Sequence, residues 1–156
     1  LPILQGSHFQ AGELTFLLPL QMEKLDPSLM QETTLSAIGL ITKVNEILAS
    51  LDLKDGLLAF KAINAKKEAV YPIFETYCRN LAITILNLQT IFDMETFVLG
   101  GGISAQSILI EEVNRQFDKV HHEIDFIGKI IKRPKIVACH HNGTNLIGAA
   151  YFLKQG

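Results

Sequence analysis

The segment around three consecutive glycines constrains the fold of this chain more than any other. A short β-rich run at residues 95–99 ends in Gly100, Gly101 and Gly102, and helical periodicity follows from Ser104. Residues without a Cβ let the backbone pass close to a ligand, and they leave amide groups exposed before a helix N-terminus. The pattern predicts a strand, a glycine loop and a helix. The loop is therefore a candidate nucleotide site, although a tight turn explains such a triplet more often.

A second unit of the same kind follows later in the chain. Residues 135–138 form another short β-rich run, and a loop containing Gly143 leads into a predicted helix at residues 144–154. Alternating strands and helices indicate an α/β fold with parallel strands, in which ligands bind at the carboxyl ends of the strands. Residues 121–133 show no clear pattern. Apolar spacing places the helix after the glycine loop at residues 104–120 and predicts three further helices over residues 34–51, 57–63 and 67–92.

Several of these predicted helices carry end signals. Thr33 or Thr34 would cap the first, Ser104 would cap the helix after the glycines, and Pro72 lies early in the long helix. The second half of that long helix is apolar nearly all round, which is typical of a helix buried on more than one side. Such a surface would equally serve to pair two copies of the chain.

The composition excludes several classes of protein. The chain has 156 residues, 48% of them hydrophobic and 19% charged, which predicts one folded domain. Its net charge of -2 offers no basic excess for nucleic acid. The cysteine pattern predicts no disulfide framework, which favours a cytoplasmic protein, and no apolar stretch is long enough to span a membrane. The chain opens at Leu1, inside an expected strand, and we therefore expect a fragment of a longer protein.

The remaining candidate residues are weaker. Glu13 follows Gly12 in a turn-rich region, where its carboxylate could accept hydrogen bonds from substrate hydroxyls or could simply be an exposed loop acid. Cys139 and His141 could point to one side of an extended chain, but zinc would need two more ligands, so we expect no metal site. No spacing indicates a catalytic residue in this chain.

Taken together, the order of these motifs resembles the C-terminal half of the ROK family of repressors, open reading frames and sugar kinases. The resemblance covers most of the chain. It rests on GSHFQAGE at residues 6–13, on the pattern of residues 81–93, on FVLGGGIS at residues 97–104 and on residues 138–150.

The resemblance implies the actin-like ATPase fold of the hexokinase and RNase H type, with residues 1–156 forming its second lobe. In the kinases of the family, Mg-ATP transfers its γ-phosphate to a sugar hydroxyl. The glycines Gly100, Gly101 and Gly102 would then lie against the adenosine and phosphates. Glu13 would bind sugar hydroxyls, and His8 falls in the loop on the sugar side. The resemblance also implies a role in carbohydrate metabolism and a homodimer.

The departures from the family pattern also carry expectations. Many members have a histidine where this chain has Phe16, followed by a cysteine-rich zinc loop, and here no cysteine lies between Glu13 and Cys78. This resembles the zinc-less branch, some of whose members look like β-glucoside kinases. The catalytic aspartate belongs to the N-terminal half, so we expect the fragment alone to be inactive. The alternative is the sugar-sensing lobe of a ROK transcriptional repressor, in which a separate N-terminal winged helix binds DNA.

Overall fold

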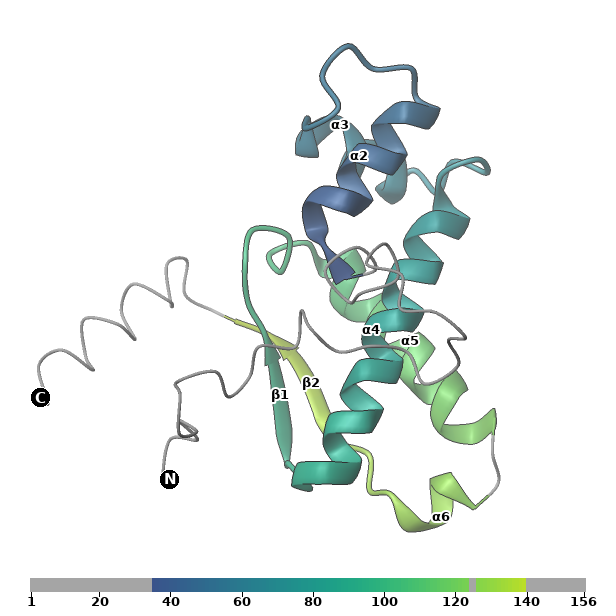
Figure 1. Cartoon of the computed structure of the whole chain (residues 1–156), viewed down its shortest axis with the longest axis vertical. Coiled ribbons are helices and arrows are strands. Elements are labelled where there is room, and N and C mark those ends of the chain that lie inside the picture. Colours follow the sequence, from purple (N-terminus) through teal and green to yellow (C-terminus); the bar gives the residue numbers. More distant parts are fainter. Residues whose placement is uncertain (1–34, 124–125, 140–156) are drawn as a thin grey trace, which may run out of the picture.

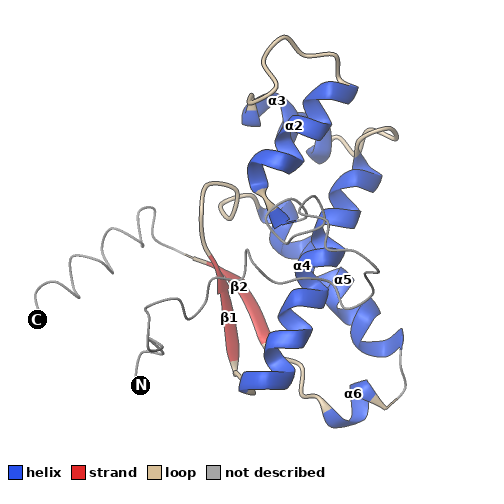
Figure 2. Cartoon of the chain, in the orientation of Figure 1, coloured by secondary structure: helices blue, strands red, loops and turns tan. Residues whose placement is uncertain are grey.

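The computed structural model describes residues 35–123 and 126–139, and shows helices on both ends and one side of a small sheet (Figure 1). Figure 2 shows the two strands lying beside the long helices, with the shorter helices above and below them. In chain order the elements are α2 (Ala37–Ile47), α3 (Gly56–Asn64), α4 (Tyr71–Phe92), β1 (Thr96–Leu99), α5 (Ser107–Glu123), α6 (Ile127–Ile130) and β2 (Lys135–Ala138).

The sheet has two parallel strands, as the sequence predicted. β1 and β2 pair in register from Thr96 opposite Lys135 to Leu99 opposite Ala138. One further bond continues the ladder, because the amide of Cys139 donates to the carbonyl of Leu99 at 2.8 Å. Both strands therefore end at the same level of the sheet, with Cys139 beside Leu99.

The core lies where α4 packs along α5, the most extensive contact between described elements. Phe74 and Cys78 on α4, and Val113 and Phe117 on α5, are fully buried there. α5 also contacts the sheet, since the side-chain amide of Asn114 donates to the carbonyl of Ile136 at 3.1 Å. The helix that follows the glycine loop is thus fixed between the sheet and α4.

The helix starts differ from the predicted ones. Ser36 caps α2, because its hydroxyl accepts from the amide of Gly39 at 3.1 Å, while Thr33 and Thr34 lie outside the described residues. Ser104 is not an N-cap. Its amide and hydroxyl both donate to the carbonyl of Gly101, at 3.2 and 2.8 Å, which closes a turn and delays α5 until Ser107.

The first predicted helix is also shorter than expected, because the backbone of α2 turns left-handed at Ala49 (φ 51°). The amide of Ala49 donates to the carbonyl of Glu46, and that of Ser50 to the carbonyl of Asn45, which is a Schellman ending. Leu51, predicted to lie on the apolar face of the helix, is instead fully exposed. α4 starts at Tyr71, four residues later than predicted, with Pro72 in its first turn.

The second half of α4 bears out the prediction of burial on more than one side. Thr84, Ile85 and Leu86 are consecutive and all buried, which at about 100° per residue covers more than half of the helix circumference. Ile83 and Ile91 on the same helix are exposed.

The unassigned stretch contains the end of α5 and the short helix α6. His121 anchors this corner, since its Nε2 lies 2.6 Å from the carbonyl oxygen of Ile131 and its ring stacks on Phe117. The predicted helix at residues 144–154 lies outside the described residues. Within the described part of the chain, no helix combines the length and apolar character that crossing a bilayer requires.

Candidate functional site

The glycine loop leaves β1 at the carboxyl end of the sheet and leads into α5. Gly101 has a positive φ of 100°, a conformation that favours glycine, so the turn itself explains this residue. The turn does not explain Gly100 or Gly102. A Cβ at either position would meet no described atom within 4 Å, and neither has a positive φ. Their lack of side chains leaves the backbone of the loop open to close approach.

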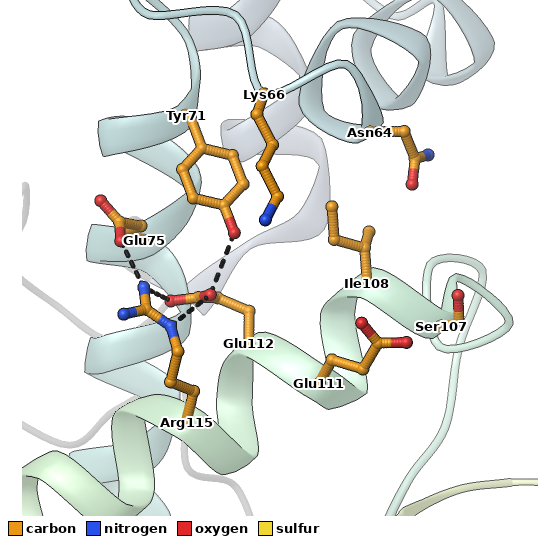
Figure 3. Close-up of a pocket in the computed structure, with 9 residues that line it drawn as sticks. All are labelled: Asn64, Lys66, Tyr71, Glu75, Ser107, Ile108, Glu111, Glu112 and Arg115. Atoms are coloured by element: carbon orange, nitrogen blue, oxygen red, sulfur yellow. Dashed lines mark hydrogen bonds and ion pairs between the residues drawn. The ribbon is translucent and has the colours of Figure 1, made fainter.

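A pocket of about 510 Å³ lies beside the end of this loop, between α5 and the segment joining α3 to α4 (Figure 3). Ser107, the first residue of α5, borders both the loop and the pocket. The lining residues are mainly polar: Asn64, Lys66, Tyr71, Glu75, Ser107, Ile108, Glu111, Glu112 and Arg115.

A hydrogen-bonded network forms one wall of the pocket. Glu112 is 4% exposed and its carboxylate accepts four hydrogen bonds. They come from the Tyr71 hydroxyl at 3.0 Å, from Arg115 at 2.9 and 2.6 Å, and from Gln116 at 2.7 Å. Burial alone would raise the pKa of Glu112, but the bonds from Arg115, Gln116 and Tyr71 outweigh it and hold the pKa below its ordinary value. Glu112 is therefore an ionised and fully engaged acceptor.

The same network engages Glu75 and Tyr71. Glu75 is ion-paired with the guanidinium of Arg115, and Figure 3 shows this pair on the side of the network next to α4. Burial, followed by the hydrogen bond to Glu112, raises the pKa of Tyr71 to about 12. The phenol therefore stays protonated, and its proton is committed to the carboxylate.

Lys66 enters the pocket from a strained backbone position. It follows the end of α3 with a φ of 48°, and the amides of Lys66 and Lys67 donate to the carbonyls of Ile63 and Ala62 in a second Schellman ending. Glycine is the usual residue there. The ammonium of Lys66 lies 5.4 Å from the centre of the Tyr71 ring, and Figure 3 shows the Lys66 side chain running beside that ring.

Glu111 differs from its neighbour Glu112 in that no described residue bonds to its carboxylate. It is exposed, lines the pocket, and accepts no hydrogen bond or ion pair from any described residue. It lies four residues after Ser107, so both side chains are on one face of α5. With Lys66 and Ser107, it gives the pocket an acceptor, a cation and a hydroxyl for a polar ligand.

The acceptor, cation and hydroxyl of the pocket are suited to binding a polar ligand. Within the described ranges, 35–123 and 126–139, no three His, Cys, Asp or Glu side chains gather as metal ligands would. Cys78 is buried, and that burial is the main cause that raises the pKa of its thiol, so it is unsuited to act as a nucleophile.

The residues proposed from the sequence fall in different places. The three glycines lie together at the end of β1, and Cys139 directly follows β2 beside Leu99. Glu13, His8 and His141 lie outside the described residues.

The sequence interpretation missed Lys66, Tyr71 and Glu111. Tyr71 was expected inside a helix over residues 67–92 and is instead its first residue, whereas Lys66 fell between two predicted helices and was assigned no role. Glu111 could have been found, because its spacing of four from Ser107 places it one turn beyond the glycine loop.

The comparisons with known proteins agree on one family. The sequence model described as "ROK family" matches residues 31–156. A solved ROK family protein from Streptococcus pneumoniae TIGR4, in complex with sucrose, matches with a TM-score of 0.77 and 24% identity over 97% of this chain and 52% of that one. A ROK hexokinase from Thermus thermophilus matches with a TM-score of 0.72 and 19% identity over 99% of this chain and 52% of that one. The chain thus spans about half the length of both structures. No curated protein sequence matches it.

Proposed function

Because the chain belongs to the ROK family, we propose that it is the C-terminal lobe of an ATP-dependent sugar kinase. Its α/β fold is the actin-like ATPase fold of the two solved relatives. One of those relatives is a hexokinase and the other was solved in complex with sucrose, which supports a sugar as the second ligand.

The open backbone at Gly100 and Gly102 is the observation that carries the nucleotide part of this proposal. No described atom requires these positions to lack a side chain, whereas a phosphate chain passing along the loop would. The loop precedes the N-terminus of α5, where backbone amides favour an anion. The phosphates of ATP would run along residues 100–102, with Mg²⁺ bound to them, and the nucleoside would enter the pocket beside Ser107.

The sugar would be bound mainly outside the described residues. Glu13 is proposed to accept hydrogen bonds from sugar hydroxyls, with His8 in the same region of the chain. Phosphoryl transfer depends mostly on positioning and on stabilising charge. In the proposed kinase, this C-terminal lobe supplies nucleotide contacts, and the N-terminal lobe supplies the base that activates the sugar hydroxyl. The 156-residue chain alone is accordingly expected to phosphorylate no sugar.

The test is ADP release by the full-length protein that carries this chain, with Mg-ATP and a panel of hexoses, N-acetylhexosamines and β-glucoside disaccharides. A sugar-dependent signal that Glu13→Gln abolishes supports the kinase and identifies its substrate class. A flat panel with intact sugar binding would overturn the kinase and favour the sensing lobe of a repressor.

A further inference from the structure

We infer that Glu111 reads the vicinal diol of a ribose, and that it makes this lobe selective for ribonucleotides over deoxyribonucleotides. The inference rests on the proposed function, because it assigns a role to one residue of the proposed nucleotide pocket. It concerns specificity and not the transfer step.

The carboxylate of Glu111 is available to a ligand. Three carboxylates line the pocket, and two of them are occupied by protein partners. Glu75 is paired with Arg115, and Glu112 already accepts four hydrogen bonds. Glu111 has no partner among the described residues and is exposed to the pocket. A ligand group that donates hydrogen bonds therefore finds one unoccupied carboxylate on this wall.

Glu111 also lies at the distance from the glycine loop at which a ribose would be expected. Ser107 ends the glycine loop, and Glu111 lies one helical turn further along the same face of α5. A nucleotide whose phosphates lie on the loop would place its next chemical unit, the ribose, one step away from the loop. Figure 3 shows Glu111 between Ser107 and the network around Glu112, on the path from the loop into the pocket.

The hydrogen-bonding capacity of a carboxylate matches that of a vicinal diol. An ionised carboxylate has two oxygens and accepts only, while a vicinal diol offers two hydroxyl donors at a matching separation. Acidic side chains recognise ribose hydroxyls in this way in dinucleotide-binding folds. The remaining wall suits a base, because the Tyr71 ring and the Ile108 side chain offer aromatic and aliphatic surface.

The experiment measures the affinity of the full-length protein for ATP, 2′-deoxy-ATP, 3′-deoxy-ATP and inosine triphosphate by isothermal titration. The variants are Glu111→Gln and, as a charge-matched control, Glu46→Gln on α2, which lies outside the pocket. We expect wild type and the control to bind ATP about tenfold more tightly than either deoxy analogue, the loss typical of one hydrogen bond to a charged group. Glu111→Gln should bind ATP and the two deoxy analogues with equal affinity, close to the affinity of wild type for the deoxy analogues.

Other outcomes separate the possible failures. Equal binding of ATP and both deoxy analogues by wild type would overturn the role of Glu111 while leaving the nucleotide site in place. If wild type lost affinity for inosine triphosphate alone, and Glu111→Gln did not discriminate against it, Glu111 would bind the exocyclic amine of the base. That outcome would overturn its binding to the ribose diol. No binding of any nucleotide would overturn the proposed function itself. Because Glu111 is exposed and has no partner among the described residues, the thermal melt of Glu111→Gln should match that of wild type, which excludes misfolding as the cause.

Discussion

The hydroxyl of Tyr71 donates a hydrogen bond of 3.0 Å to the carboxylate of Glu112, and so joins the first turn of α4 to the middle of α5 across 41 residues of sequence. The pair forms the wall of the proposed nucleotide pocket and also borders the buried contact between the two helices. The same polar contacts therefore hold the two helices together and shape the wall of the pocket.

Two adjacent glutamates on α5 should respond very differently to truncation. Glu112→Ala should lower the free energy of unfolding by about 2–4 kcal/mol, because it leaves Gln116 and Tyr71 without their acceptor and Arg115 with Glu75 alone. Glu111→Ala should change it by less than about 0.5 kcal/mol. Urea unfolding of both variants checks this, and equal losses of unfolding free energy would contradict the hydrogen-bond network around Glu112.

The network also predicts how stability depends on acid. The pKa of Glu112 is lower in the folded protein than in the unfolded chain, so its stabilising contribution is complete at neutral pH. The contribution should fade as pH falls below the ordinary glutamate value of about 4.3 and then through the lowered value. Urea unfolding between neutral pH and pH ~3 should show the gap between wild type and Glu112→Gln narrowing in acid. A constant gap would mean that ionisation of Glu112 is irrelevant.

Two tyrosines should titrate late, and only one should depend on Glu112. Burial, then the bond to Glu112, raises the pKa of Tyr71 to about 12, and burial raises that of Tyr77 to about 12. In Glu112→Gln the pKa of Tyr71 should fall toward 10 while that of Tyr77 stays unchanged as an internal reference. Alkaline titration by tyrosinate absorbance, with Tyr71→Phe for assignment, measures both. A shift of both residues would indicate general unfolding.

The three glycines should separate a structural role from a binding role. Gly101→Ala forces a Cβ into a positive φ of 100° and should cost about 1–2 kcal/mol of stability. Gly102→Ala has open space and should melt like wild type, yet weaken ATP binding by the full-length protein. Calorimetry and titration of both variants test this. Unchanged ATP affinity in Gly102→Ala would leave the loop as a turn only.

Two left-handed residues at helix ends provide a matched pair. Ala49→Gly removes backbone strain after α2 and should stabilise the protein by about 0.5–1 kcal/mol, with no effect on ATP. Lys66→Gly relieves the equivalent strain after α3 but removes the cation from the pocket, so it should gain similar stability and lose ATP affinity. Equal ATP affinity in the two variants would exclude Lys66 from the site.

Strands and long helices were predictable from the sequence because their signals are local. The run at 135–138 and the glycines at 100–102 each lie between a clear apolar pattern and a turn, and the structure has β2 at the predicted residues. Helix ends were less predictable. Several residues could cap each helix, and the choice between Ser104 and Ser107 depended on a bond from Ser104 back to Gly101.

The pocket was not predictable from local patterns, because its walls come from three separate segments. Tyr71 and Glu112 meet only when α4 packs along α5, and nothing in the residues around either one indicates that contact. The exposure of Glu111 beside the buried Glu112 also follows from that packing. Residue types indicated the family, while the free and occupied carboxylates required the fold.

The saturation of Glu112 has a consequence for how such a lobe can change over evolutionary time. Its partners lie at positions 71, 115 and 116, and loss of any one leaves a buried charge partly unmatched. Single substitutions there are penalised, so drift at these positions should occur as paired replacements. Glu111, one residue away and exposed, is under no such constraint, so the lining of the pocket can change at this position without a matching change in the core.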